Sequence, residues 1–140
     1  MAVFLAQQEQ FSAAESMYIR TLAGYEKALG PEHTLTLGIC ENLGSLYVDQ
    51  GKLIEAERMF ERALVEKEKA LGSDHTSTLN TVHNLGSLYV DQGKLTEAEC
   101  TLQRALTGYE KVVGREHRRI VNARHDLNVV YYLQDTLDVA

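Results

Sequence analysis

Five histidines are the residues of this sequence best suited to chemistry, and they fall into two sets whose members stand 42 positions apart. The first set is His33, His75 and His117, and each of the three follows an acidic residue at a predicted turn. Metal ligands must converge to about 2 Å from one ion, whereas equivalent atoms of stacked repeats lie about a helix diameter apart. The spacing therefore favours capping of the turn, and we expect no metal or other cofactor.

The second set, His83 and His125, could supply a general base. Asp126 directly follows His125 and could orient its imidazole. No serine or cysteine is placed to complete a nucleophilic triad, because Cys100 is predicted to lie on a different kind of helix. A hydrogen-bonding role on the surface is therefore favoured, and no catalytic residue is assigned.

The two cysteines, Cys40 and Cys100, lie far apart in the sequence and belong to no ligand motif. Cys40 stands where the next repeat has Val82, so we expect a buried small apolar residue. Cys100 stands where the preceding repeat has Arg58, so we expect it nearer the surface. Two unpaired thiols suit a reducing compartment better than a disulfide framework, and a cytoplasmic location is expected.

The charge and hydropathy of the chain disfavour several classes of function. Its formal net charge of -6 would be repelled by nucleic acid and by anionic membrane surfaces, so neither is an expected partner. No uninterrupted apolar run approaches the roughly 20 residues that span a bilayer. The glycines stand singly at predicted junctions and form no phosphate-binding loop.

An internal repeat, whose copies start 42 positions apart, carries the histidines and cysteines. Residues 30–71 and 72–113 align without a gap, and 25 of their 42 positions are identical. Partial copies occupy residues 1–29 and 114–140. A repeat of this length is one supersecondary unit stacked on its neighbours, so we expect residues 1–140 to form a single domain.

Each repeat is predicted to contain two helices. Apolar residues recur every three or four positions over residues 37–48, as one face of a helix requires. Gly51 breaks this pattern, and a second helix is predicted over residues 53–71. The hydroxyl of Thr76 is placed to cap the helix that follows. No strand is needed, so the expected fold class is all-α.

The repeat resembles the tetratricopeptide (TPR) consensus, because its small and aromatic residues stand at the spacings of that motif: Leu43, Gly44, Tyr47, Ala56, Phe60 and Ala63, then Leu85, Gly86, Tyr89, Ala98, Leu102 and Ala105. The period of 42 exceeds the ~34 of the standard repeat. Together with junctions such as Leu71-Gly72-Ser73-Asp74-His75, it is similar to the kinesin light chain subtype, which also forms the sensor end of nucleotide-binding receptor (STAND-type) ATPases. The resemblance implies a right-handed superhelical stack of antiparallel helix hairpins, with about seven helices and truncated terminal repeats.

The same resemblance implies that the first helices of successive hairpins line a concave groove. Their residues not used for packing are mostly amides, hydroxyls and carboxylates: Asn42, Ser45, Asp49, Asn80, Asn84, Ser87, Asp91, Arg119, Asn122 and Asp126. Amides can both donate to and accept from the backbone of an extended peptide, as Asn does at the matching position of kinesin light chain repeats. A peptide-binding groove is therefore the hypothesis, and ordinary solvated helix positions are the alternative.

The last copy differs from the others by a basic patch, formed by Arg115, Arg118, Arg119 and Arg124. In an acidic protein this is a local reversal of sign that could attract a carboxylate-rich or phosphorylated segment. A solvated charged face is the alternative interpretation.

The terminal copies predict apolar side chains that no helix covers: Val3, Phe4 and Leu5 near one end, and Val129, Val130, Tyr132 and Leu133 near the other. Exposed patches of this kind find partners, and a homodimer joined through a terminal face is expected. The sequence thus predicts a protein–protein interaction module, part of an adaptor or of a receptor's sensor, that binds a peptide or protein segment. A self-assembling scaffold is the alternative, and a helical-repeat enzyme is the alternative from another class.

Overall fold

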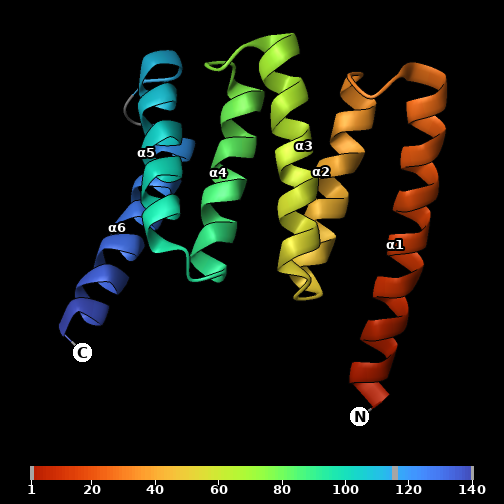
Figure 1. Cartoon of the computed structure of the whole chain (residues 1–140), viewed down its shortest axis with the longest axis horizontal. Coiled ribbons are helices and arrows are strands. Elements are labelled where there is room, and N and C mark those ends of the chain that lie inside the picture. The colour runs from red at the N-terminus through yellow and green to blue at the C-terminus, as the bar shows by residue number, and fades with distance from the viewer. Residues whose placement is uncertain (1, 115–116, 140) are drawn as a thin grey trace. The chain divides into compact units, whose positions relative to one another are not determined.

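The computed structural model describes residues 2–114 and 117–139, and every regular element in these ranges is an α-helix (Figure 1). The six helices are α1 (Ala2–Leu29), α2 (Thr34–Asp49), α3 (Leu53–Leu71), α4 (Thr76–Asp91), α5 (Leu95–Val112) and α6 (Arg118–Val139). The predicted all-α fold is confirmed, and α3 has the bounds that the repeat indicated.

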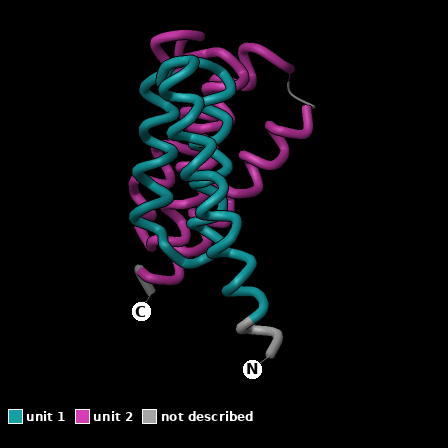
Figure 2. Tube along the Cα trace, turned by 90° about the vertical axis from the view of Figure 1, so that its right-hand side faces the viewer, with its two compact units in different colours: residues 1–66 teal, residues 67–140 magenta. Residues whose placement is uncertain are grey.

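The helices form two compact units (Figure 2). The first unit, Met1–Glu66, contains α1, α2 and most of α3. The second, Lys67–Ala140, contains the end of α3 followed by α4, α5 and α6. In the second unit, α4 and α5 lie side by side as an antiparallel hairpin (Figure 1).

Glycines in the left-handed region of φ separate the helices. They recur at a constant spacing, twice in each full repeat, at Gly30, Gly51, Gly72, Gly93 and Gly114. Gly51 (φ 79°) and Gly93 (φ 77°) reverse the chain inside the hairpins, and the residue after each donates its amide to a carbonyl five positions earlier, at 2.8 Å in both turns. Glycine adopts this conformation without the steric strain that a Cβ would add, so these two positions fix where the first helix of a hairpin ends.

The two terminal helices lack such a turn. Glu9 and Asp135 stand where the complete repeats have Gly51 and Gly93. Without a residue suited to the left-handed turn the helical ladder continues, so α1 and α6 run through the position as single helices of 28 and 22 residues. This explains why six helices are seen in the described ranges where the sequence indicated about seven.

Small residues let the two helices of each hairpin approach closely. A Cβ on Gly44 would lie 2.9 Å from Cε1 of Phe60, and one on Gly86 would lie 2.6 Å from Cδ2 of Leu102. These distances are shorter than any ordinary van der Waals contact, so a side chain at either glycine would displace the facing residue. The core of the second unit continues from Leu102 to Val130 of α6, and both side chains are fully buried.

Histidines cap the first helices of the two complete repeats and of the last partial repeat. His33 Nδ1 accepts the amide of Leu35 (3.1 Å), and His75 Nδ1 accepts that of Ser77 in the same way (3.1 Å). His117 caps α6 equivalently. The capping role predicted for these histidines is confirmed, but the prediction for Thr76 is wrong, because Thr76 is already the first residue of α4. The imidazole succeeds because Nδ1 branches from Cγ, as the oxygen of an asparagine or aspartate cap does.

Candidate binding site

Polar side chains of α4 and α6 join in the second unit. Nε2 of His83 lies 2.7 Å from Oδ2 of Asp126, and the Ser87 hydroxyl approaches the same oxygen at 3.4 Å. An ionised carboxylate can only accept, so Nε2 of His83 is the donor. The His83 contact is the strong one, because 3.4 Å is long for a hydroxyl donor. Asp126 is thereby held in one orientation on the surface of α6.

Asn80 is the centre of a second group of contacts that joins three helices. Its Oδ1 accepts the hydroxyl of Tyr109 on α5 (2.5 Å) and Nη1 of Arg119 on α6 (2.8 Å). Tyr109 is almost fully buried, and this burial raises the pKa of its phenol, an effect that the nearby Arg119 guanidinium partly opposes. The ring of His83 stands edge-on to that of Tyr109, with centroids 6.5 Å apart. These contacts hold the polar side chains between α4 and α6 in fixed positions.

A small notch opens beside this network. Ser87, Val90 and Asp91 from α4 line one side, and Asp126 and Val129 from α6 line the other. Its volume is about 150 Å³. Two carboxylates and two branched apolar side chains thus share one hollow, a combination that suits a ligand with both apolar and cationic parts.

The residues predicted for the groove all lie outside the core. Asn84, Asp91 and Asn122 are exposed in the second unit, and Asn42, Ser45 and Asp49 are exposed in the first. Four others are half-buried, and the structure joins them in two pairs: Asn80 with Arg119, and Ser87 with Asp126. Neither Asn42 nor Asn84 makes a side-chain hydrogen bond to another described residue, so both amides can reach a ligand.

The residues of the basic patch have different surroundings. Arg119 is committed to Asn80, whereas Arg118 is exposed. Arg124 lies 4.0 Å from Glu110, at the limit of an ion pair. Arg115 lies outside the described residues. Of the arginines of the basic patch that the structure describes, Arg118 and Arg124 therefore direct their charge mainly to solvent.

Comparison with known proteins identifies the repeat. The family model described as tetratricopeptide repeat matches residues 1–64 and 37–111, well over half of the sequence. The chain belongs to the tetratricopeptide repeat family. No curated protein matches the sequence at a significant level.

Three solved TPR structures are similar to this chain. A Podosopora anserina protein assigned as a kinesin light chain, with nearly identical TPR-like repeats, has a TM-score of 0.80 and 27% identity over 89% of this chain and 59% of its own. Its Q17M variant gives 0.77 and 26% over 92% and 61%. BtubC (BKLC) from P. vanneervenii gives 0.82 at 24% identity, over 95% and 52%, and supports the fold alone. This TPR chain thus spans between about half and three fifths of the proteins that it matches, and its kinesin light chain-like character is confirmed.

The pairing of His83 was not foreseen from the sequence. The sequence offered Asp126 as a residue that could orient its neighbour His125, but its carboxylate contacts His83 of α4, and His125 is exposed. Adjacent residues of a helix point about 100° apart, so Asp126 and His125 face different neighbours. Tyr109 was also missed. The repeat offered a signal for it, because Lys67 stands at the position equivalent to Tyr109. Such different residue types at one repeat position indicate that the side chain has different contacts in the two copies.

Lys67 is itself a buried residue that the sequence did not single out. Its Nζ donates to Oγ1 of Thr81 (3.0 Å) and to the carbonyl of Ser77 (3.3 Å). Lysine is almost never fully buried unless its ammonium is paired or hydrogen-bonded, and these contacts supply acceptors for it. The side chain therefore ties the end of α3 to α4 within the second unit.

The cysteines occupy the predicted surroundings. Cys40 is fully buried in the first unit, and burial raises the pKa of its thiol, while the nearby Arg62 guanidinium opposes that shift. Cys100 is exposed and lines a cleft of about 320 Å³ on α5. Within residues 2–114 and 117–139, no group of three or more His, Cys, Asp or Glu side chains could hold a metal ion. None of the described helices is long and apolar enough to cross a membrane.

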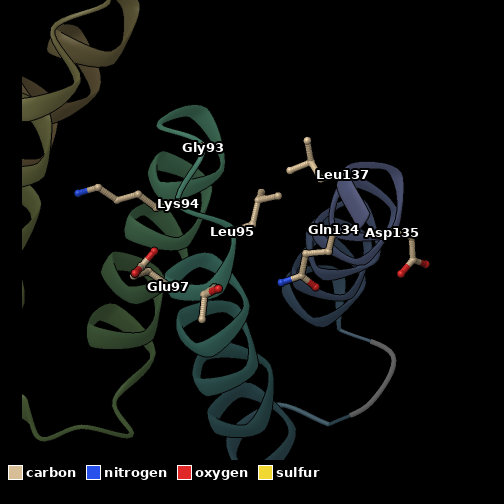
Figure 3. Close-up of a pocket in the computed structure, with 8 residues that line it drawn as sticks. Gly93, Lys94, Leu95, Glu97, Gln134, Asp135 and Leu137 are labelled. Atoms are coloured by element: carbon tan, nitrogen blue, oxygen red, sulfur yellow. The ribbon is translucent and has the colours of Figure 1, made fainter. Parts of the chain in front are cut away.

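A larger hollow of about 630 Å³ lies where α6 continues past the missing turn (Figure 3). Gly93, Lys94 and Leu95, from the turn and the start of α5, line one side of it, and Gln134, Asp135 and Leu137 of α6 line the other; the side chains of Lys94 and Asp135 point away from each other (Figure 3). Gln134 crosses to α5, where its amide donates to Glu99 Oε2 (3.0 Å). The hollow thus follows directly from the straight course of α6.

Proposed function

We propose that this TPR chain binds an extended segment of a partner protein along the exposed faces of α4 and α6. TPR repeats are in general protein–protein interaction modules, and the proposal assigns that role to a particular surface. The observation that carries it is Asn84, an exposed amide one turn before Ser87 on α4 that makes no side-chain hydrogen bond to a described residue. An amide in this position can pair with both the donor and the acceptor of a peptide backbone.

The other predicted groove residues belong to the same proposal. Asn42, Ser45 and Asp49 on α2 are exposed and have the residue types of Asn84, Ser87 and Asp91 on α4. Asn122 adds a further exposed amide on α6. We assign these side chains to contacts with the partner, and we assign Arg118 and Arg124 to attraction of its acidic parts. That attraction weakens as salt rises across the physiological range, because exposed charges are screened.

The wider role that fits this surface is that of an adaptor or of the sensing end of a receptor. The likeness to a kinesin light chain structure supports an adaptor, since the similar repeats cover most of this chain. We further propose that the four repeat copies, residues 1–29, 30–71, 72–113 and 114–140, act as one interaction domain without catalytic activity, in the cytoplasm. TPR proteins are typically non-enzymatic scaffolds.

A peptide library displayed on phage tests the proposal. Selection on the chain should return binding peptides, and Asn84→Ala should weaken their affinity by about 1–2 kcal/mol, the value of a lost hydrogen bond. Thr107→Ala is the control, because Thr107 is also exposed but lies on α5, outside the faces of α4 and α6 to which the ligand is assigned. If Asn84→Ala lowers the free energy of unfolding by as much as it lowers the free energy of binding, Asn84 has a structural role and its assignment to the ligand is refuted.

Self-association is the second candidate function, favoured by apolar side chains on the outer surface of α6. Val121 is 53% exposed and Tyr132 is 70% exposed, and both lie on one face of the helix. Val129 is also partly exposed and Leu133 is half-buried, but the expectation that Val130 lacks cover is wrong, because it packs against α5. Val3, Phe4 and Leu5 lie outside the described side chains.

Sedimentation at micromolar concentration decides between the two candidates. Self-association predicts a dimer that Val121→Asp with Tyr132→Asp dissociates, because charge on both positions would be buried in the contact. A monomer of 15.7 kDa that persists on concentration contradicts self-association and leaves peptide binding as the remaining proposal.

A further inference from the structure

The notch between α4 and α6 has the dimensions and lining of a pocket for one side chain. We infer that it receives a lysine or arginine side chain of the bound segment, an inference that rests on the proposed function. Val90 and Val129 provide apolar surface on the two helices, and Asp91 and Asp126 provide negative charge beside it. Lysine and arginine match this arrangement, because each ends a methylene stem with a cation.

The size of the notch fits such a stem. At about 150 Å³ it resembles the cavities that accept a benzene-sized group. Unlike those sealed cavities, it has carboxylates in its lining, so a neutral apolar guest would leave charge partly desolvated. A cationic guest can bury its methylene groups against the valines and keep its head beside the carboxylates.

The hydrogen bonds around the notch leave acceptors for a cation. His83 and Ser87 both approach Oδ2 of Asp126, and Oδ1 of the same carboxylate accepts no hydrogen bond from a described residue. Asp91 is exposed at the end of α4 and likewise makes no such bond. No basic side chain is among the residues that line the notch. The Nε2–H of His83 orients Asp126 without occupying both of its oxygens, so the carboxylate is ready for a charge-assisted bond.

The repeat shows which features of the notch are particular to α6. The α4 side is shared, since Ser87, Val90 and Asp91 match residues 45, 48 and 49 of α2. The α6 side is not, because Asp126 and Val129 stand where α4 has Asn84 and Ser87. The two changes add one carboxylate and one apolar wall. Asp126→Asn and Val129→Ser therefore give α6 the residues that α4 has at these positions, and we call them the reversal variants.

Titration of the ¹⁵N-labelled chain with Nα-acetyl-lysine methylamide tests the inference directly. We expect chemical-shift changes confined to the amides around the notch at millimolar ligand, with a weaker response to the norleucine analogue, which keeps the stem and lacks the charge. The glutamate analogue should produce no change there. Equal responses to lysine and norleucine, or no response to lysine at tens of millimolar, would overturn the inference.

The reversal variants locate the effect. Asp126→Asn should weaken lysine binding about fivefold, the value of a partly exposed charge pair, and Val129→Ser should weaken it about twofold through lost apolar contact. Asp135→Asn is the control, because Asp135 is a carboxylate of α6 that lines the other hollow. If Asp126→Asn disturbs the spectrum beyond the notch, Val129→Ser and Asp91→Asn carry the test. Lysine binding that is unchanged in all three variants contradicts the site.

Phage selection separates this inference from the proposed function. Selected peptides with a lysine or arginine at a fixed position, whose binding Asp126→Asn weakens, support both. Peptides that bind without any such residue overturn the inference and leave the proposed function intact. Failure to select any peptide, while lysine methylamide still shifts the notch resonances, contradicts the proposed function and leaves the cation pocket established.

Discussion

The helices α4 and α6 derive from the same part of the repeat, and they use their apolar residues differently. Both bury one stripe: Thr78, Thr81, Leu85 and Leu88 on α4, and Ile120, Ala123, Leu127 and Val130 on α6. A second stripe of α4, formed by Leu79, Val82 and Gly86, is also buried. Its equivalents on α6 are Val121, Arg124 and Asn128, and all three are exposed.

This difference separates two functions of a first helix. On α6 the shared stripe packs against α5, with Leu127 and Val130 beside Ala98 and Leu102, and α6 keeps it because without it the helix would not pack at all. The second stripe of α4 receives α5 of its own hairpin, with Leu102 against Gly86 and Gly108 against Leu79. On α6 the polar Asn128 stands at the position of Gly86, so a second helix could not approach there as closely as α5 approaches α4.

Exchange of the residues at positions 86 and 128 should have the largest effect on stability. Gly86→Asn places a side chain against the fully buried Leu102 and should lower the free energy of unfolding by about 2–3 kcal/mol, as overpacked cores do. The reverse change, Asn128→Gly, should cost less than about 1 kcal/mol, since only helix propensity is involved. Chemical denaturation measures both. A Gly86→Asn protein as stable as the parent would show that the hairpin can open at this point.

A second test compares two asparagines at equivalent positions. Asn80 on α4 accepts hydrogen bonds from Tyr109 and Arg119, whereas Asn122 on α6 is exposed. Asn80→Ala should therefore lower stability by about 1.5 kcal/mol, because a charged donor and a buried hydroxyl lose their acceptor. Asn122→Ala should change it by less than about 0.5 kcal/mol. Equal effects would mean that the three-helix contact does not persist in solution.

The histidine caps are a feature that α4 and α6 have in common, so their removal should affect both helices equally. His75→Ala and His117→Ala should each cost about 1 kcal/mol, because each removes the acceptor of one backbone amide. Replacement by aspartate, a preferred cap, should restore most of the loss. Circular dichroism during thermal unfolding measures the change. A loss seen only at His75 would indicate that the start of α6 is frayed.

The smallest predicted effect is a pH dependence of stability that is absent at neutral pH and appears only in alkali. Burial raises the pKa of Tyr109 in the folded chain, so below about pH 10 the phenol is neutral in both states and its contribution is complete. Above that pH the unfolded chain ionises first, and stability falls until the folded phenol ionises too. Tyr109→Phe should flatten this part of the profile, while Cys40 and Tyr47, whose pKa values burial also raises, keep their own alkaline losses. An unchanged slope would contradict the assignment.

Much of the fold could be predicted because it depends on local signals. The turn at Gly51 and the end of α3 at Leu71 follow from single residues. The straight course of α1 and α6 could also have been anticipated, since Glu9 and Asp135 occupy the turn position in the aligned repeats. Thr76 was misassigned because threonine is a commoner cap than histidine, although the neighbouring His75 had been given the same role.

The contacts of the candidate site were less accessible to sequence reasoning. The repeat showed that Asp126 replaces an asparagine, but not that its carboxylate would meet His83, 43 positions earlier. That contact depends on the rotation of α6 relative to α4, which packing of the buried stripe sets. The same rotation brings Val90 and Val129 to one notch, and it also buries Val130, which the sequence left uncovered.

The regular spacing of the left-handed glycines has a consequence for how such a chain can change in length. Two successive intervals between these glycines make one full repeat, and they return the chain to the same direction and the same helix type. A duplication or deletion of one full repeat therefore preserves the neighbours of every remaining helix, wherever in the repeat its ends fall. A change of half a repeat would place first-helix sequence where a second helix belongs. The array can thus grow only by whole hairpins, and each added hairpin brings a new first-helix surface that can diverge toward a different ligand while the fold stays the same.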